Sequence, residues 1–161
     1  MIDLNEALRM DGKTVIVTGA ASGIGSGIAR FLSDVGADVA IFDINLPQGE
    51  ETAESIRNNG GKARFFLCDV TDARKVEQVV TNVVQDFGRI DCLVNCAGVI
   101  FRSNVLDLSE NQWNLTMDVA VKGVFLVSKY VIRHMKENGG GKIINISSVS
   151  AKYGGDRKSV V

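Results

Sequence analysis

The stretch Lys13-Thr14-Val15-Ile16-Val17-Thr18-Gly19-Ala20-Ala21-Ser22-Gly23-Ile24-Gly25 decides the fold of this chain. Its first part is rich in β-branched residues, which is typical of a strand buried on both faces. Glycines follow at positions 19, 23 and 25, and Ile28-Ala29-Arg30-Phe31-Leu32 then repeats apolar residues at helical spacing. A strand, a glycine turn and a helix in this order predict a phosphate-binding turn, because backbone N–H groups and the positive end of the helix dipole meet there.

Each glycine has its own role in such a turn. Gly19 lets the chain turn sharply, Gly23 lets a diphosphate approach the backbone, and Gly25 lets the helix and the strand pack closely. Asp43 ends a second strand over residues 38–42, twenty residues after Gly23. A carboxylate at that place can accept both hydroxyls of an adenosine ribose. The spacing therefore favours a dinucleotide site over a structural turn that merely precedes a solvated aspartate.

Composition limits what else the chain can be. Its 161 residues and 45% apolar content suit a single domain over residues 1–161. The formal net charge is −1, and no long basic or acidic run indicates a nucleic acid or an anionic membrane as partner. No window approaches the roughly eighteen apolar residues of a spanning helix, and Met1–Gly12 resembles neither a signal peptide nor an anchor.

The three cysteines point to a reducing compartment. Cys68, Cys92 and Cys96 are odd in number and lie in apolar, strand-like segments, which is typical of free thiols. No histidine or second cysteine pair accompanies them, so we expect no metal site. We expect a cytoplasmic protein without nucleic-acid or membrane partners.

Strands and helices alternate along the chain. The pattern predicts strands over 13–18, 38–43, 63–68, 90–94 and 142–147, and helices over 23–35, 47–57, 72–87 and 110–138, with Thr71 or Asp72 as the cap of the third helix. Five strands separated by helices imply a parallel sheet with right-handed crossovers. The expected fold is α/β, a Rossmann-type doubly wound parallel sheet of order 3-2-1-4-5.

Four motifs in this order make the chain similar to the short-chain dehydrogenases/reductases. Thr18–Gly25 resembles the family's TGxxxGIG coenzyme motif, and Asp69-Val70 resembles its adenine-contacting pair. Asn95-Cys96-Ala97-Gly98 is similar to its NNAG segment, with cysteine at the second asparagine. Residues 141–148 resemble its fifth strand, whose catalytic serine is here Ser148. The resemblance covers nearly the whole chain and implies a sheet that is incomplete at its C-terminal side.

The resemblance implies an NAD-dependent oxidoreductase that transfers hydride between nicotinamide and a small alcohol or carbonyl substrate. Ser148 would hold the substrate oxygen, no metal is implied, and a complete chain would form a homo-oligomer, either a dimer or a tetramer. The residues implied to bind the cofactor are Thr18, Gly19, Ser22, Gly23, Ile24, Gly25, Asp43, Ile44, Asp69, Val70, Asn95, Ala97 and Gly98.

Charge favours NAD over NADP. The 2′-phosphate of NADP would meet the like charge of the Asp43 carboxylate. Relatives that prefer NADP tend to carry a basic residue before the middle glycine or after the second strand. Those places hold Ser22 and Ile44-Asn45 in this chain.

Two departures from the family pattern concern catalysis. The family carries a catalytic asparagine seven residues after a tryptophan, and this asparagine positions a relay water by kinking the helix. Seven residues after Trp113 this chain has Ala120, while Gly123 matches the glycine of the same pattern. The family's Tyr-x-x-x-Lys motif does not occur in residues 1–161, since Tyr153 is followed four residues later by Arg157. We therefore expect residues 1–161 alone to be inactive, with Tyr153 in a loop that covers the site.

Two other interpretations stay open. The chain could be a shortened relative that binds a nucleotide or a partner without catalysis. It could also be a Rossmann-like methyltransferase that uses the acidic residue after strand two for a different ribose. The spacing of the first loop and the Asn-Cys-Ala-Gly segment speak against methyl transfer.

Overall fold

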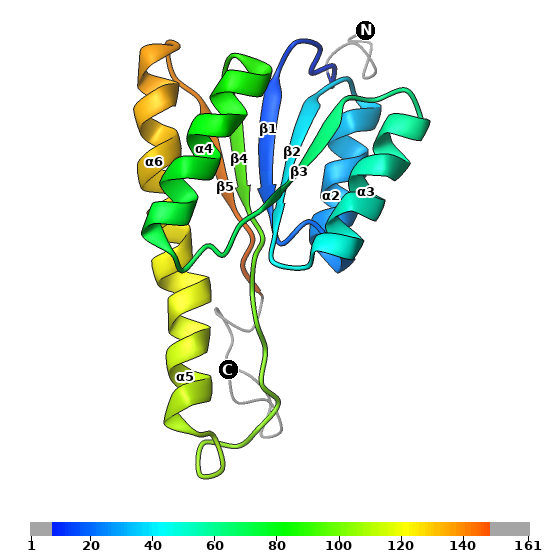
Figure 1. Cartoon of the computed structure of the whole chain (residues 1–161). Coiled ribbons are helices and arrows are strands. Elements are labelled where there is room, and N and C mark those ends of the chain that lie inside the picture. Colours follow the sequence, from blue (N-terminus) through cyan, green and yellow to red (C-terminus); the bar gives the residue numbers. More distant parts are fainter. Residues whose placement is uncertain (1–7, 149–161) are drawn as a thin grey trace, which may run out of the picture.

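Five parallel strands form one sheet in the computed structural model, which describes residues 8–148. The sheet order is β3-β2-β1-β4-β5 (Figure 1), which confirms the predicted α/β fold. The strands are β1 (Thr14–Thr18), β2 (Asp38–Asp43), β3 (Ala63–Leu67), β4 (Cys92–Asn95) and β5 (Lys142–Asn145).

Two helices pack on each face of the sheet. One face carries α2 (Gly23–Asp34) and α3 (Leu46–Asn58), and the other carries α4 (Ala73–Phe87) and α6 (Val124–Glu137) (Figure 1). The helix α5 (Glu110–Met117) and the π-helical turn η1 (Asp118–Gly123) lead into α6, and α5 extends past the carboxyl ends of the strands. No helix of the described part of the chain is long and apolar enough to cross a membrane.

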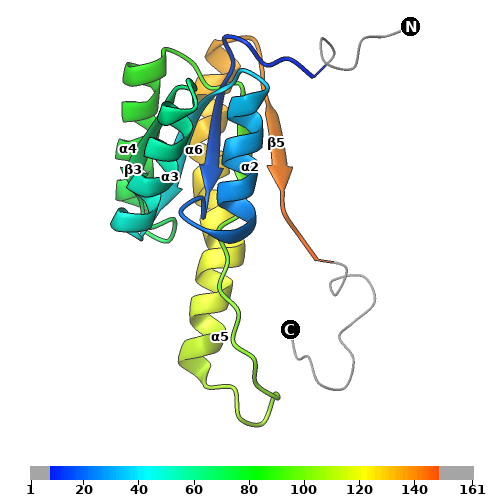
Figure 2. The ribbon, with the colours of Figure 1, turned by 90° about the vertical axis from the view of Figure 1, so that its right-hand side faces the viewer.

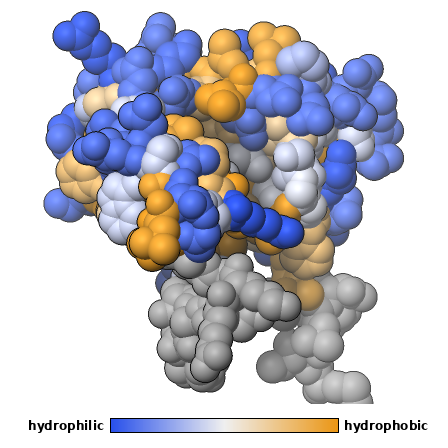
Figure 3. All heavy atoms as spheres, turned by 90° about the horizontal axis from the view of Figure 1, so that it is seen from below, coloured by the Kyte–Doolittle hydropathy of each residue, from blue (hydrophilic) through white to orange (hydrophobic). Residues whose placement is uncertain are grey.

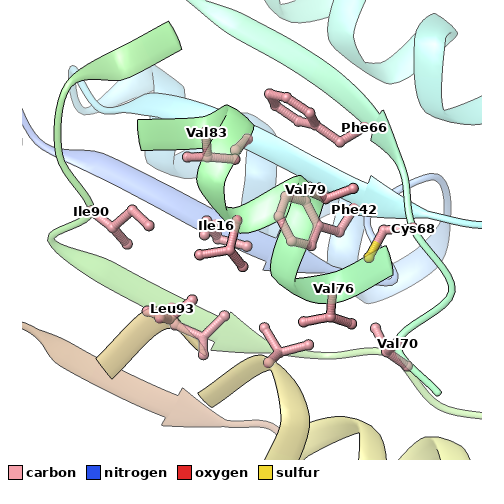
Figure 4. Packing of buried hydrophobic residues seen from close by; sticks show 14 of the residues in the cluster. Ile16, Phe42, Phe66, Cys68, Val70, Val76, Val79, Val83, Ile90 and Leu93 are labelled. Atoms are coloured by element: carbon pink, nitrogen blue, oxygen red, sulfur yellow. The ribbon is translucent and has the colours of Figure 1, made fainter. Parts of the chain in front are cut away.

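Alternating side chains of the strands build a core on each face. Val15 and Val17 of β1 belong to the cluster under α2 and α3, whereas Ile16 belongs to the cluster under α4 and α6. Figure 4 shows the second cluster, in which Ile16 and Leu93 face the valines of α4. Burial of each such side chain contributes about 1.5–3 kcal/mol, so both faces of the inner strands stabilise the fold.

Several element boundaries differ from the predicted ones. The fourth strand begins at Cys92 because its ladder with β1 starts where Cys92 pairs with Val15, although Ile90 is fully buried. The fifth strand ends at Asn145, and the helix expected over 110–138 is interrupted by η1. Of the two predicted caps of α4, Asp72 is the one used, since its carboxylate accepts the N–H groups of residues 74 and 75.

The face of β4 and β5 beside α2 carries no helix within residues 8–148 (Figure 2). Ile144 and Ile146 are 49% and 42% exposed on this side. A groove of about 990 Å³ runs there, and Phe31 and Leu32 of α2 form part of its wall. β5 is also the edge of the sheet, so no part of the chain from residue 8 to residue 148 covers its outer edge or this face.

Candidate functional site

A cleft of about 550 Å³ lies at the carboxyl ends of the strands, which is where ligands bind in doubly wound sheets. Figure 3 looks onto this end of the molecule. Eleven of the thirteen predicted cofactor residues line the cleft: Gly19, Ser22, Gly23, Ile24, Gly25, Asp43, Ile44, Asp69, Val70, Ala97 and Gly98.

The glycine turn forms one wall of the cleft. A side chain would overlap backbone atoms at Gly19 and Gly25, and at Gly23 it is disfavoured by the positive φ angle alone. A Cβ atom at Gly19 would lie 2.7 Å from Cα of Ala97, and the φ angle of Gly19 is +66°. A Cβ atom at Gly25 would lie 2.2 Å from the carbonyl oxygen of Gly19. Gly23 has a φ angle of +55° and open space where its Cβ would be. The backbone at Gly23 is therefore open to close approach, which suits a diphosphate.

The carboxylate of Asp43 connects this turn to the turn after β2. Its Oδ2 accepts the N–H of Ala21 at 3.0 Å, and its Oδ1 accepts the N–H of Asn45 at 2.9 Å. The N–H of Gly19 also donates to the carbonyl oxygen of Phe42 at 2.8 Å. Each carboxylate oxygen retains capacity for a second hydrogen bond. Asp43 can therefore hold the turn and accept ribose hydroxyls at the same time.

Thr18 and Asn95 lie behind the cleft rather than on its surface. Thr18 is 1% exposed, and its Oγ1 accepts the N–H groups of Cys96 and Ala97 at 3.0 Å each. Asn95 is 3% exposed, and its amide donates to Oδ1 of Asn145 at 2.9 Å. Both side chains tie β4 to its neighbours, so the geometry gives them a positioning role, and direct contact with a cofactor stays a prediction.

The segments after β3 and β4 contribute two cysteine thiols and one aspartate to the lining of the cleft. Burial, and then the nearby charge of Asp69, raise the pKa of the Cys68 thiol to about 12. Burial also raises the pKa of Cys96. Both thiols lining the cleft are therefore protonated at neutral pH and add no negative charge beside a bound phosphate. Asp69 accepts two hydrogen bonds from Thr71, one from its N–H and one from its hydroxyl.

Residues of α5 and η1 also line the cleft. Leu115 and Val119 line it, and sequence reasoning did not single them out, although their spacing of four on an expected helix was a usable signal. A Cβ atom at Gly123 would lie 2.7 Å from Cγ2 of Val70, so Gly123 lets η1 approach this wall. Ala120 lies within η1 and is exposed. The chain therefore forms a π-helical turn at the position where the family carries its asparagine, although the residue here is alanine.

The predicted catalytic serine lies three residues after the end of β5. The N–H of Ile146 donates to the carbonyl oxygen of Asn95 at 2.9 Å, which keeps the chain beside β4 past the end of the strand. Ile146 lines the cleft, and Ser148 follows two residues later and is exposed. Tyr153 and Arg157 lie outside the described residues. Between residues 8 and 148, no group of three or more His, Cys, Asp or Glu could hold a metal ion.

Known proteins resemble the chain in sequence and fold. A family model described as short chain dehydrogenase matches residues 13–160. An uncharacterised oxidoreductase of Thermotoga maritima is 45% identical over 153 residues, which are 95% of this chain and 60% of that protein. D-threitol dehydrogenase of Mycolicibacterium smegmatis is 42% identical over 143 residues, which are 89% of this chain and 55% of that protein.

A solved structure repeats the fold with a cofactor in place. 7α-hydroxysteroid dehydrogenase, in complex with NADH and 7-oxo glycochenodeoxycholic acid, superposes with a TM-score of 0.88 and is 32% identical. The match covers 94% of this chain and 59% of that chain. The chain therefore spans about 55–60% of the length of these similar proteins.

Proposed function

We propose a function from one premise: the chain belongs to the short-chain dehydrogenase family, whose model matches residues 13–160. The whole protein would be an oxidoreductase that exchanges hydride between NAD and an alcohol or carbonyl substrate. The observation that carries the proposal is the cleft in which the glycine turn, Asp43 and the Asp69-Val70 pair meet. The turn fits a dinucleotide because Gly23 offers its backbone where a side chain would project into open space.

Charge in the cleft supports NAD as the cofactor. The Asp43 carboxylate stands where the adenosine ribose is expected, and a 2′-phosphate there would be repelled. The neighbouring Ser22 and Ile44 offer no positive charge, and the Ile44 side chain is exposed at the mouth of the cleft. NADP would therefore lack a partner for its additional phosphate.

Hydride transfer would also need residues that hold the substrate and keep water away from it. When bound, the nicotinamide cofactor supplies the hydride donor or acceptor. The Ser148 hydroxyl would donate a hydrogen bond to the substrate oxygen and orient the reacting carbon. Ile146 and Ile100 would exclude water on that side, since both line the cleft. No residue of the described chain stands out as the group that moves the proton.

Assembly and compartment are also proposed for the whole protein. We expect a homo-oligomer, because large apolar side chains on one side of α5, η1 and α6 are more than half exposed, namely Trp113, Val121 and Phe125. Free cysteines at positions 68, 92 and 96 support a reducing compartment such as the cytoplasm.

A turnover assay tests the proposed activity. The protein as produced from its own gene should reduce NAD with at least one member of a panel of polyols, sugars, secondary alcohols and hydroxysteroids. Ser148→Ala should lower kcat by roughly 100-fold or more, since it removes a donor to the developing oxyanion. Binding of NAD without turnover across the panel would favour the non-catalytic alternative. Binding of S-adenosylmethionine instead of NAD would favour the methyltransferase.

Asp43 should determine the choice of coenzyme. In the double variant Asp43→Ala with Ile44→Arg, the repulsion is removed and a guanidinium partner for the 2′-phosphate is added. We expect the ratio of NADP to NAD affinity to rise by roughly 100-fold. Parallel titrations with both dinucleotides measure this ratio, and Asp34→Ala on the exposed carboxyl end of α2 is a control for the loss of one carboxylate. Equal affinities of the wild-type protein for NAD and NADP would contradict the charge argument.

A further inference from the structure

We propose that Thr52 of α3 is a positioning residue that holds the glycine turn and thereby supports the selection of NAD over NADP. The inference rests on the proposed function, because it assumes that the cleft takes a dinucleotide. It concerns a side chain that neither lines the cleft nor belongs to the family motifs named above.

Thr52 is a buried polar residue with one bond that crosses between elements. Its side chain is 1% exposed, and its Oγ1 donates to the carbonyl oxygen of Ala21 at 3.2 Å. The two residues are 31 positions apart, and the bond connects α3 to the turn between β1 and α2. Loss of a buried hydrogen bond of this kind leaves the carbonyl oxygen without its partner, which destabilises this conformation of the turn.

Ala21 is held from two sides. Its carbonyl oxygen accepts from Thr52, and its N–H donates to Oδ2 of Asp43 at 3.0 Å. Because a trans peptide is planar with C=O and N–H in opposite directions, fixing the Ala21 carbonyl also fixes the direction of the Ser22 N–H. Ser22 lines the cleft. Thr52 therefore constrains both the phosphate-facing backbone and the carboxylate that faces the ribose.

The position of Thr52 is itself determined by close packing of α3. A Cβ atom at Gly49 would lie 2.1 Å from the ring of Phe65, so this glycine lets α3 lie close against β3. Thr52 follows three residues later on the same buried face, together with Ala53 and Ile56. A valine at position 52 would fill nearly the same space, so its main effect there would be the loss of the hydrogen bond to Ala21.

Three variants test the inference in the protein as produced from its own gene. Thr52→Val removes the hydroxyl at nearly constant shape, and Thr52→Ser keeps it. Thr81→Val is the matched control, since the Thr81 hydroxyl donates to the carbonyl oxygen of Glu77 on the exposed side of α4. The measurements are the Kd values for NAD and NADP, the Tm, and the hydrogen-exchange rates of the Ala21 and Ser22 amides.

Thr52→Val should weaken NAD binding by about fivefold to tenfold, the range that loss of one hydrogen bond produces. NADP binding should weaken less, so the preference for NAD falls, and both amides should exchange faster. Thr52→Ser should stay close to wild type in all four measurements, and Thr81→Val should leave the NAD to NADP ratio unchanged.

The outcomes separate this inference from the proposed function. A lower Tm for Thr52→Val with unchanged NAD to NADP ratio and unchanged exchange at Ala21 and Ser22 would show a purely structural role and overturn the inference. Failure of the wild-type protein to bind either dinucleotide would contradict the proposed function. In that case, unchanged exchange in Thr52→Val overturns the positioning role, and faster exchange confined to the turn supports it.

Discussion

Gly25→Ala should weaken NAD binding by roughly 100-fold and destabilise the β1–α2 turn by about 3 kcal/mol. The new Cβ atom would lie 2.2 Å from the carbonyl oxygen of Gly19 and 2.8 Å from its carbonyl carbon. Both are backbone atoms of the same turn, so relief of the overlap requires displacement of the phosphate-facing backbone. Titration with NAD and thermal unfolding measure the two effects.

Gly27→Ala is the matched control within the same helix. A Cβ atom at Gly27 meets nothing within 4 Å, and alanine in a helix interior is more favourable than glycine by about 0.5–1 kcal/mol. We expect unchanged NAD affinity and a slightly higher Tm. If Gly25→Ala binds NAD as the wild-type protein does, the glycine turn is not the dinucleotide wall that we propose.

A polypeptide of residues 1–161 by itself should associate and show no turnover. In the described part of the chain, Ile144 and Ile146 are exposed beside a groove of about 990 Å³, and β5 pairs with a strand on one side only. Open edges and apolar faces favour association. Each 100 Å² of apolar surface left uncovered forgoes about 2.5 kcal/mol of stabilisation, which is a substantial share of the ~5–15 kcal/mol stability of a whole domain.

Light scattering coupled to size-exclusion chromatography checks this prediction. Ile144→Glu should reduce the association of residues 1–161, whereas Ile24→Glu, on a side chain exposed beside the cleft, should not. A monodisperse monomer of residues 1–161 with a cooperative thermal transition and measurable oxidoreduction would contradict the prediction.

Local patterns were enough to predict a parallel sheet and most of the cleft lining, whereas the order of the strands was predicted from the Rossmann-type fold. The β-branched run before Gly19 and the alternation of helices and strands determine the parallel sheet, because crossovers have one hand. Asp43 and Asp69 were found because each directly follows or ends a strand, and such residues meet at one edge of the sheet.

Contacts between distant segments explain what the sequence did not predict. The π-helical turn at 118–123 contains no proline, and its approach to Val70 through Gly123 is a tertiary contact. The bonds from Cys96 and Ala97 to Thr18 likewise depend on how β1 and β4 lie together. Thr52 stood on the apolar face of its helix, but nothing local showed that it would meet Ala21.

The central claim is that the cleft at the carboxyl ends of the strands holds NAD, and hydrogen exchange with and without NAD tests it most directly. We predict that saturating NAD slows exchange in the segments that line the cleft, namely residues 19–25, 43–45, 69–71 and 97–100. Exchange in segments that line only the groove, including residues 138–142, should stay unchanged. Bound NAD that protects the groove, or that leaves residues 19–25 unprotected, would contradict this account.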